Sequence, residues 1–224
     1  MSTNAERYFS IRDRIVGAVT GWTDGQHDAV VPACPDWTVH QLLTHVVAMP
    51  MAITAGDLPD GADVDGWLQG LVDRHCSRPV EDLCAWWESD DVALEALCER
   101  AGVLVGDLFV HESDLHGAVG SRECRDTPEL ASHLALSVVA FGNDIAAADP
   151  GLAPVRVATG TGDHRTGEGD PGWTLRVDAW EAHRALNSRR TRSELLTLPA
   201  DGDASPYLDV LHDHLPLPDV SLGE

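Results

Sequence analysis

The segment Gly102–Gly120, GVLVGDLFVHESDLHGAVG, constrains this chain most, because it combines a helical apolar pattern with two acid–histidine pairs. Asp107 stands four residues before His111, and Glu112 stands four residues before His116. Residues i and i+4 lie on one face of an α-helix, so either pair can present a carboxylate and an imidazole to one divalent metal ion. Such a site needs at least one further ligand from a facing helix, which predicts a bundle.

The helical positions of the two pairs leave both open as ligands. With His111 set at zero, Asp107 lies at about −40°, whereas Glu112 and His116 lie at about +100° and +140°. The apolar residues of the segment centre at roughly +60°, between the two pairs. The periodicity slightly favours Asp107 and His111, with Asp114 on the same side at about −60°.

An earlier helix offers a third ligand. In VPACPDWTVHQLLTHVVAMP, Pro32 and Pro35 predict an extended segment, and Asp36 can cap a helix that begins near Trp37. His45 lies among the apolar residues of this helix, so we expect it to point inward. A lone inward histidine is more often a hydrogen-bonded core residue than a ligand, but here it coincides with an acid–histidine pair.

Three nitrogen and oxygen ligands would leave open positions on a metal, as catalytic sites do. Ligands of this kind without a thiolate suit Zn, Fe, Ni or Mn, and zinc is our first expectation.

The first 149 residues are predicted to form a helical bundle. Apolar residues recur at helical spacing in six segments, namely 4–20, 37–50, 67–74, 79–100, 102–120 and 128–148. Residues 150–224 differ in character and predict a small α+β module. VRVAT and WTLRV alternate like strands around the loop GTGDHRTGEGDPG; a helix at 178–188, a short strand at LLTLP and a closing helix at PYLDVLHDHL follow.

Charge and cysteine content narrow the function classes. The net charge of −22 disfavours binding to nucleic acid and to anionic membranes. The charged residues 1–14 do not predict a signal peptide, and no apolar run is expected to span a bilayer. Five widely spaced cysteines, without a CxxC motif, suit a reduced cytoplasmic protein in which they are small core or surface residues.

A basic cluster stands out in this acidic chain, formed by Arg184, Arg189, Arg190 and Arg192. Cations at a helix end interact favourably with the helix dipole, so a solvated helix end is one interpretation. A clamp for a carboxylate-bearing ligand is the other.

The segment VPACPDWTVHQLLTHVVAMP resembles the opening motif of the mycothiol-dependent maleylpyruvate isomerase family, within the DinB-like bundle superfamily. The matching residues are Pro32, Cys34, Trp37, Thr38 and the metal-binding histidine, His45. GDLFVHESDLHGAVG resembles the second signature of the family, which ends at Gly120.

In that register the resemblance implies Asp107 and His111 as metal ligands and Asp114 as an adjacent acid that orients a ligand or relays a proton. The isomerases have Glu at the position of Asp107. Their catalytic Arg from the C-terminal domain is matched by Arg189 or Arg190, which would hold a substrate carboxylate.

The resemblance therefore implies a mainly α fold, a DinB-like four-helix bundle of residues 1–149 with a C-terminal α+β module. It implies a metal-dependent thiol enzyme, a mycothiol-dependent S-transferase or isomerase that acts on a small electrophile as a monomer or homodimer. The Asp107 difference favours S-transfer. The alternative is a non-catalytic bundle that binds a small ligand or a partner.

Overall fold

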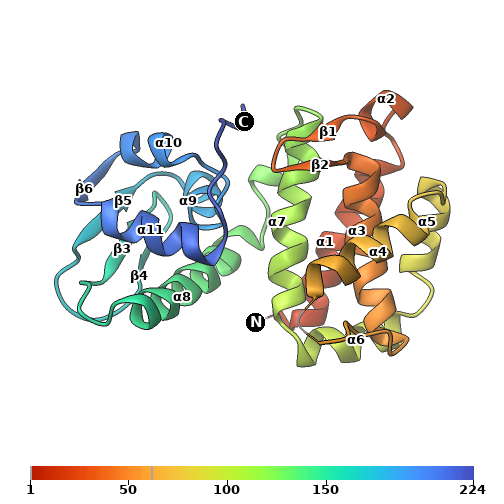
Figure 1. Cartoon of the computed structure of the whole chain (residues 1–224), viewed down its shortest axis with the longest axis horizontal. Coiled ribbons are helices and arrows are strands. Elements are labelled where there is room, and N and C mark those ends of the chain that lie inside the picture. Colours follow the sequence, from red (N-terminus) through yellow and green to blue (C-terminus); the bar gives the residue numbers. More distant parts are fainter. Residues whose placement is uncertain (1, 62) are drawn as a thin grey trace. The chain divides into compact units, whose positions relative to one another are not determined.

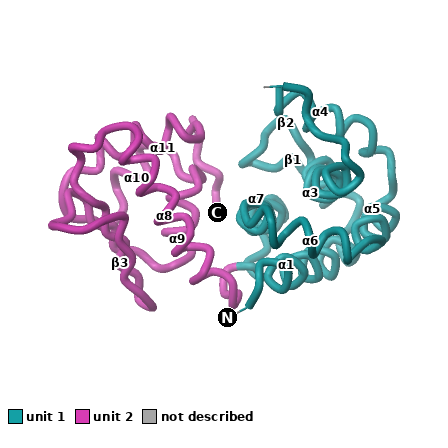
Figure 2. Tube along the Cα trace, turned by 90° about the horizontal axis from the view of Figure 1, so that it is seen from below, with its two compact units in different colours: residues 1–124 teal, residues 125–224 magenta. Residues whose placement is uncertain are grey.

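The computed structural model describes residues 2–61 and 63–224, and the chain divides into two compact units (Figure 2). Unit 1 comprises residues 1–124 and unit 2 comprises residues 125–224. The chain is mainly helical with an α+β C-terminal part, which confirms the predicted fold class.

Unit 1 is a helical bundle with one short β-hairpin (Figure 1). Helix α7 packs against both α1 and α3, and α3 also packs against α4, α5 and α6. The elements are α1 (Asn4–Val19), α2 (Asp24–His27), β1 (Val30–Val31), β2 (Cys34–Thr38), α3 (Val39–Thr54), α4 (Val64–His75), α5 (Val80–Trp87), α6 (Asp91–Arg100), α7 (Val103–Ala118) and the 3-10 turn η1 (Glu123–Arg125).

Unit 2 is built on a four-stranded sheet of order β4-β3-β5-β6. Strands β3 and β5 are parallel, with Val155 opposite Trp173, and the outer pairings are antiparallel. The elements are α8 (Leu130–Ala148), β3 (Val155–Ala158), β4 (Asp163–Arg165), β5 (Trp173–Arg176), α9 (Ala179–Leu186), α10 (Arg192–Thr197), β6 (Ala200–Gly202) and α11 (Ser205–His214).

Helix α8 packs with the sheet of unit 2. Its buried residues Leu134, Val138 and Phe141 share one apolar core with Val155 and Trp173. The division between the units therefore falls at 124/125, earlier than the expected boundary at 149/150. The helix is long and apolar enough to cross a membrane by length and composition alone, and its buried residues pack in the core of unit 2.

Three further differences from the sequence predictions have local causes, and helix capping explains the first two. The expected helix 79–100 is broken, because the Asp90 side chain accepts a hydrogen bond from the Ala93 N–H and starts α6 anew. In LLTLP a helix replaces the expected strand, because Thr191 and Glu194 form a capping box that starts α10. Part of the expected loop GTGDHRTGEGDPG forms β4, which pairs with β3.

Candidate metal centre

The β1–β2 hairpin and the cap of α3 position His45. The Thr38 hydroxyl accepts a hydrogen bond from the Gln41 N–H at 3.3 Å, and the Gln41 side chain accepts one from the Thr38 N–H at 2.9 Å. This capping box fixes the first turn of α3. His45 follows two turns later, is 4% exposed, and packs against the Trp37 ring with centroids 5.1 Å apart.

Helix α7 brings the other three expected residues to one place. The His111 Nε2 lies 3.5 Å from Asp107 Oδ1, and its Nδ1 lies 3.1 Å from Asp114 Oδ2. The His111 ring packs edge-on against the His45 ring, with centroids 5.2 Å apart. The i, i+4 and i, i+3 spacings predicted from the sequence thus surround His111 with a carboxylate at each ring nitrogen.

The expected ligand atoms converge. One ligand atom each from His45, Asp107 and His111 lies within 4.8 Å of the others. The Nδ1 atom of His45 is buried and has no hydrogen-bond partner among the described residues. A buried imidazole with an unsatisfied nitrogen, close to a carboxylate and a second imidazole, fits a site for a divalent metal.

The pKa values of His45 and His111 shift in opposite directions. Burial, together with the nearby His111, lowers the pKa of His45 to about 4, so His45 is neutral at pH 7 and carries a free lone pair. Burial also opposes a charged His111, but the Asp107 and Asp114 carboxylates outweigh it and raise the pKa of His111 to about 9. A metal ion at this site would therefore replace a proton on His111.

The competing acid–histidine pair faces other partners. Glu112 accepts two hydrogen bonds from Arg14 of α1, at 2.7 and 2.9 Å. The Nδ1 of His116 lies 2.9 Å from the Ser121 hydroxyl, and its ring packs edge-on against Trp22. Both residues are buried rather than at the bundle surface, and neither belongs to the group around His45.

The sequence analysis missed the position of Cys34. Its sulfur, a His111 ring nitrogen and an Asp114 carboxylate oxygen lie within 4.8 Å of one another. Cys34 begins strand β2, which leads directly into α3, so the hairpin places the thiol beside α7. The available signal was that Cys34 lies in the extended segment just before the helix that carries His45.

The arginines expected to bind a substrate carboxylate belong to unit 2. Arg190 donates hydrogen bonds to Glu181 at 2.7 and 2.8 Å and to Glu224 at 3.0 Å, so protein carboxylates already engage its guanidinium. Arg184 also pairs with Glu224. Arg189 donates to the Asn187 carbonyl at 2.9 Å, and its role toward a substrate stays a prediction.

Comparison with known proteins gives one family. Residues 9–103 match the family described as the mycothiol maleylpyruvate isomerase N-terminal domain. The match includes the hairpin, α3 and His45, and it ends at the first residue of α7, before Asp107 and His111. No curated protein and no solved structure matches the chain. The similarity to the mycothiol maleylpyruvate isomerase N-terminal domain is therefore carried by residues 9–103, which lie within unit 1.

Proposed function

We propose that unit 1 binds one divalent metal ion through His45, Asp107 and His111 and is a metal-dependent thiol enzyme. The convergence of these three ligand atoms within 4.8 Å carries the proposal, and the buried His45 ring with its unsatisfied Nδ1 supports it. Three protein ligands suit a catalytic site, which keeps a position open. Zinc remains the first metal to test.

The residues around the site have distinct roles in this proposal. His45 contributes a neutral imidazole and Asp107 a carboxylate. Asp114 is a positioning residue, because its carboxylate lies 3.1 Å from His111 Nδ1, which leaves Nε2 on the side of Asp107. A divalent metal held there would lower the pKa of a thiol and favour its thiolate at neutral pH.

Mycothiol is the proposed thiol cosubstrate, because the family that residues 9–103 match is named after mycothiol. In S-transfer, a bond forms between the thiol sulfur and an electrophilic carbon, and the bond from that carbon to its leaving group breaks. In isomerisation, the sulfur would instead add to a conjugated double bond and leave again. We favour S-transfer to a small electrophile, because Asp107 is one methylene shorter than the Glu expected in the isomerases.

We further propose a reducing, cytoplasmic location. All five cysteines are free thiols in the structure, and a thiol cosubstrate must also stay reduced.

Thiol consumption tests the proposal. Purified full-length protein, loaded with zinc, is mixed with mycothiol and a panel of small electrophiles, and the loss of free thiol is measured. We expect turnover that stops on chelation and in His111→Ala. The matched control is His116→Ala, which removes a buried histidine from the same helix without touching the proposed ligands.

Two results would support the competing class, a non-catalytic bundle that binds a small ligand. One is thiol loss at the same rate with and without metal. The other is a metal-loaded protein that consumes no thiol with any electrophile of the panel.

A further inference from the structure

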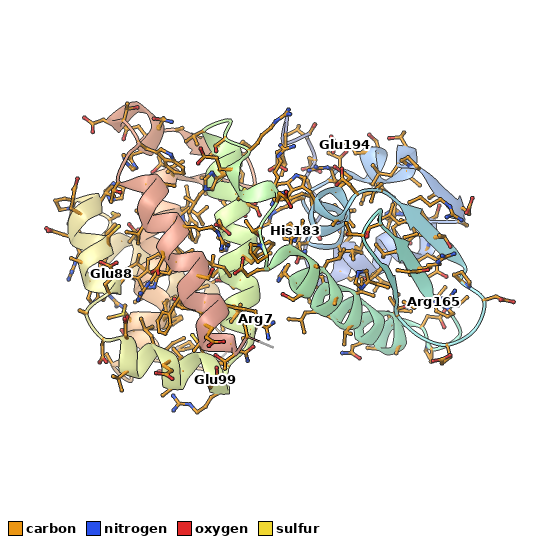
Figure 3. The ribbon with its side chains drawn as sticks, turned by 180° about the vertical axis from the view of Figure 1, so that it is seen from behind. Arg7, Glu88, Glu99, Arg165, His183 and Glu194 are labelled. Carbon is orange, nitrogen blue, oxygen red and sulfur yellow. The ribbon has the colours of Figure 1, made fainter. Side chains whose placement is uncertain are left out.

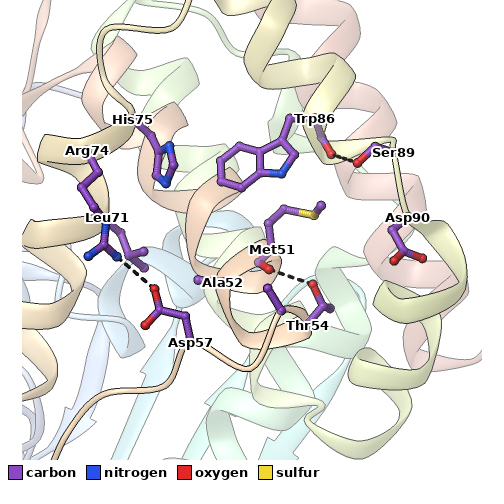
Figure 4. Close-up of a pocket in the computed structure, with 11 residues that line it drawn as sticks. Met51, Ala52, Thr54, Asp57, Leu71, Arg74, His75, Trp86, Ser89 and Asp90 are labelled. Atoms are coloured by element: carbon purple, nitrogen blue, oxygen red, sulfur yellow. Dashed lines mark hydrogen bonds and ion pairs between the residues drawn. The ribbon is translucent and has the colours of Figure 1, made fainter.

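A pocket lies in unit 1, between α3, α4 and α5 (Figure 4). Its volume is about 440 Å³, which is within the range of small-molecule sites. The buried floor is apolar and consists of Met51, Ala52 and Leu71. None of the proposed metal ligands lines it, so the pocket is a separate feature of the bundle.

An aromatic wall stands beside this floor. Trp86 and His75 lie next to each other, with ring centroids 4.7 Å apart and planes at 45° (Figure 4). The Arg78 guanidinium carbon lies 4.5 Å from the Trp86 ring centroid, so a cation–π contact also holds the indole. The pocket thus presents a fixed aromatic surface against which a flat ring can pack.

The carboxylates at the rim are already engaged by donors. Asp57 accepts hydrogen bonds from Trp67 Nε1 at 3.2 Å and from Arg74 at 3.1 Å. Asp90 accepts from the backbone N–H of Ala93 at the start of α6. Protein donors therefore already use part of the acceptor capacity of both carboxylates.

The donors at the rim are in excess. Among the described residues, Arg74 donates only to Asp57, although a guanidinium carries five N–H groups. The ion pair is exposed, with side-chain exposures of 54% and 49%, so it contributes little stability and can accommodate another anion. Within the same described part of the chain, neither the His75 ring nor the Trp86 N–H has a protein hydrogen-bond partner.

We propose that this pocket binds a small aromatic carboxylate. The ring would pack on Trp86 and His75 above Met51, and the carboxylate would accept hydrogen bonds from Arg74. The net charge of −22 repels anions at long range. Binding of a carboxylate therefore depends on the unused N–H groups of Arg74 at the rim of the pocket.

Benzoate binding to the full-length protein tests the proposal, measured by chemical-shift titration in the presence of a chelator that keeps the metal centre empty. We expect saturable binding of benzoate, with Arg74→Gln weakening it about tenfold, or about 1.4 kcal/mol. Benzamide has the same shape without the charge, so Arg74→Gln should leave its affinity unchanged. Trp86→Leu should weaken benzoate more than it weakens cyclohexanecarboxylate, whose ring is not flat.

Two control variants separate ligand binding from folding. Asp57→Asn breaks the same ion pair but leaves Arg74, so benzoate should bind at least as tightly as to the unaltered protein. Arg100→Gln removes an exposed arginine at the far end of α6 and should change nothing. Equal benzoate affinity in Arg74→Gln and the unaltered protein would overturn the proposal. So would an equal loss in Asp57→Asn, or no binding at about 10 mM benzoate.

Discussion

His111 takes its orientation from two carboxylates on its own helix. Asp107 lies one turn before it and Asp114 one turn after it, so each ring nitrogen faces an anion. Glu112, the next residue along α7, points instead to Arg14 of α1. Asp107 and Asp114 thus contact His111, whereas Glu112 forms an ion pair with α1, because its side chain leaves the helix in another direction.

The positioning role of Asp114 predicts a loss of metal affinity without a loss of fold. Asp114→Asn keeps the shape of the side chain but removes its charge, so we expect zinc affinity to fall by about 10- to 100-fold. A competitive titration against a chelating dye measures it. Asp82→Asn, on the exposed side of α5, is the matched control and should bind zinc normally. Equal affinities in both variants would refute the role.

The Arg14–Glu112 pair predicts the opposite result, a loss of stability without a loss of metal. Glu112→Gln leaves Arg14, whose side chain is 28% exposed, without its anionic partner, and we expect a destabilisation of about 2 kcal/mol. Urea unfolding measures the free energy, and metal analysis measures occupancy. Unaltered stability together with lost metal would make Glu112 a ligand and reverse the assignment.

At the scale of elements, the cap of α3 connects the hairpin to the metal centre. Thr38 ends β2 and caps α3, so the same residue closes the strand that carries Cys34 and starts the helix that carries His45. Thr38→Ala should cost about 1 kcal/mol in unfolding free energy, because the partly buried first turn of α3 loses its capping oxygen. Thr38→Ser keeps the oxygen and should retain most of the stability. Equal effects of the two substitutions would contradict the capping role.

Helices α8 and α9 meet through a pair of buried histidines. The rings of His133 and His183 lie 5.0 Å apart, and burial lowers the pKa of His133 to about 4. An unfolded histidine titrates at about 6.5, so the folded state of His133 holds its proton less well. Its contribution to stability is complete above pH 6.5 and is lost as the pH falls toward 4, by up to about 3 kcal/mol.

Urea unfolding of the unaltered protein and of His133→Gln at pH 7, 5.5 and 4 tests this pH dependence. Glutamine does not titrate, so the stability difference between the two proteins should shift in favour of His133→Gln as the pH falls. Parallel pH profiles would contradict the assignment.

The spacing of apolar residues predicted the long helices, but it did not predict helix ends that are fixed by capping side chains. Helix α7 follows from apolar spacing alone, and so does the meeting of Asp107 with His111. The start of α3 does not, because Asp36 and Thr38 are both good capping residues and only the strand pairing of β2 shows that Asp36 lies in the strand. The position of Cys34 likewise depends on a long-range packing of the hairpin on α7, which one-dimensional spacing does not contain.

At the scale of the whole chain, the division into units also depends on long-range packing. The sequence pattern of α8 is that of any buried helix, so it could belong to the bundle or to the sheet. Its core contacts with Val155 and Trp173 assign it to unit 2. The family match covers residues 9–103 within unit 1, so the proposed metal centre combines His45 from the matched segment with Asp107 and His111, which lie beyond it.

Zinc titration of the metal-free protein tests the central claim most directly. We predict about one tightly bound ion per chain, with tight binding lost in His45→Ala and in His111→Ala. The controls are His40→Ala on α3, whose ring contacts the Arg78 carbonyl, and His116→Ala on α7; both should keep the ion. Full zinc occupancy in His45→Ala and His111→Ala, or its loss in the two controls instead, would contradict the assignment of the metal centre.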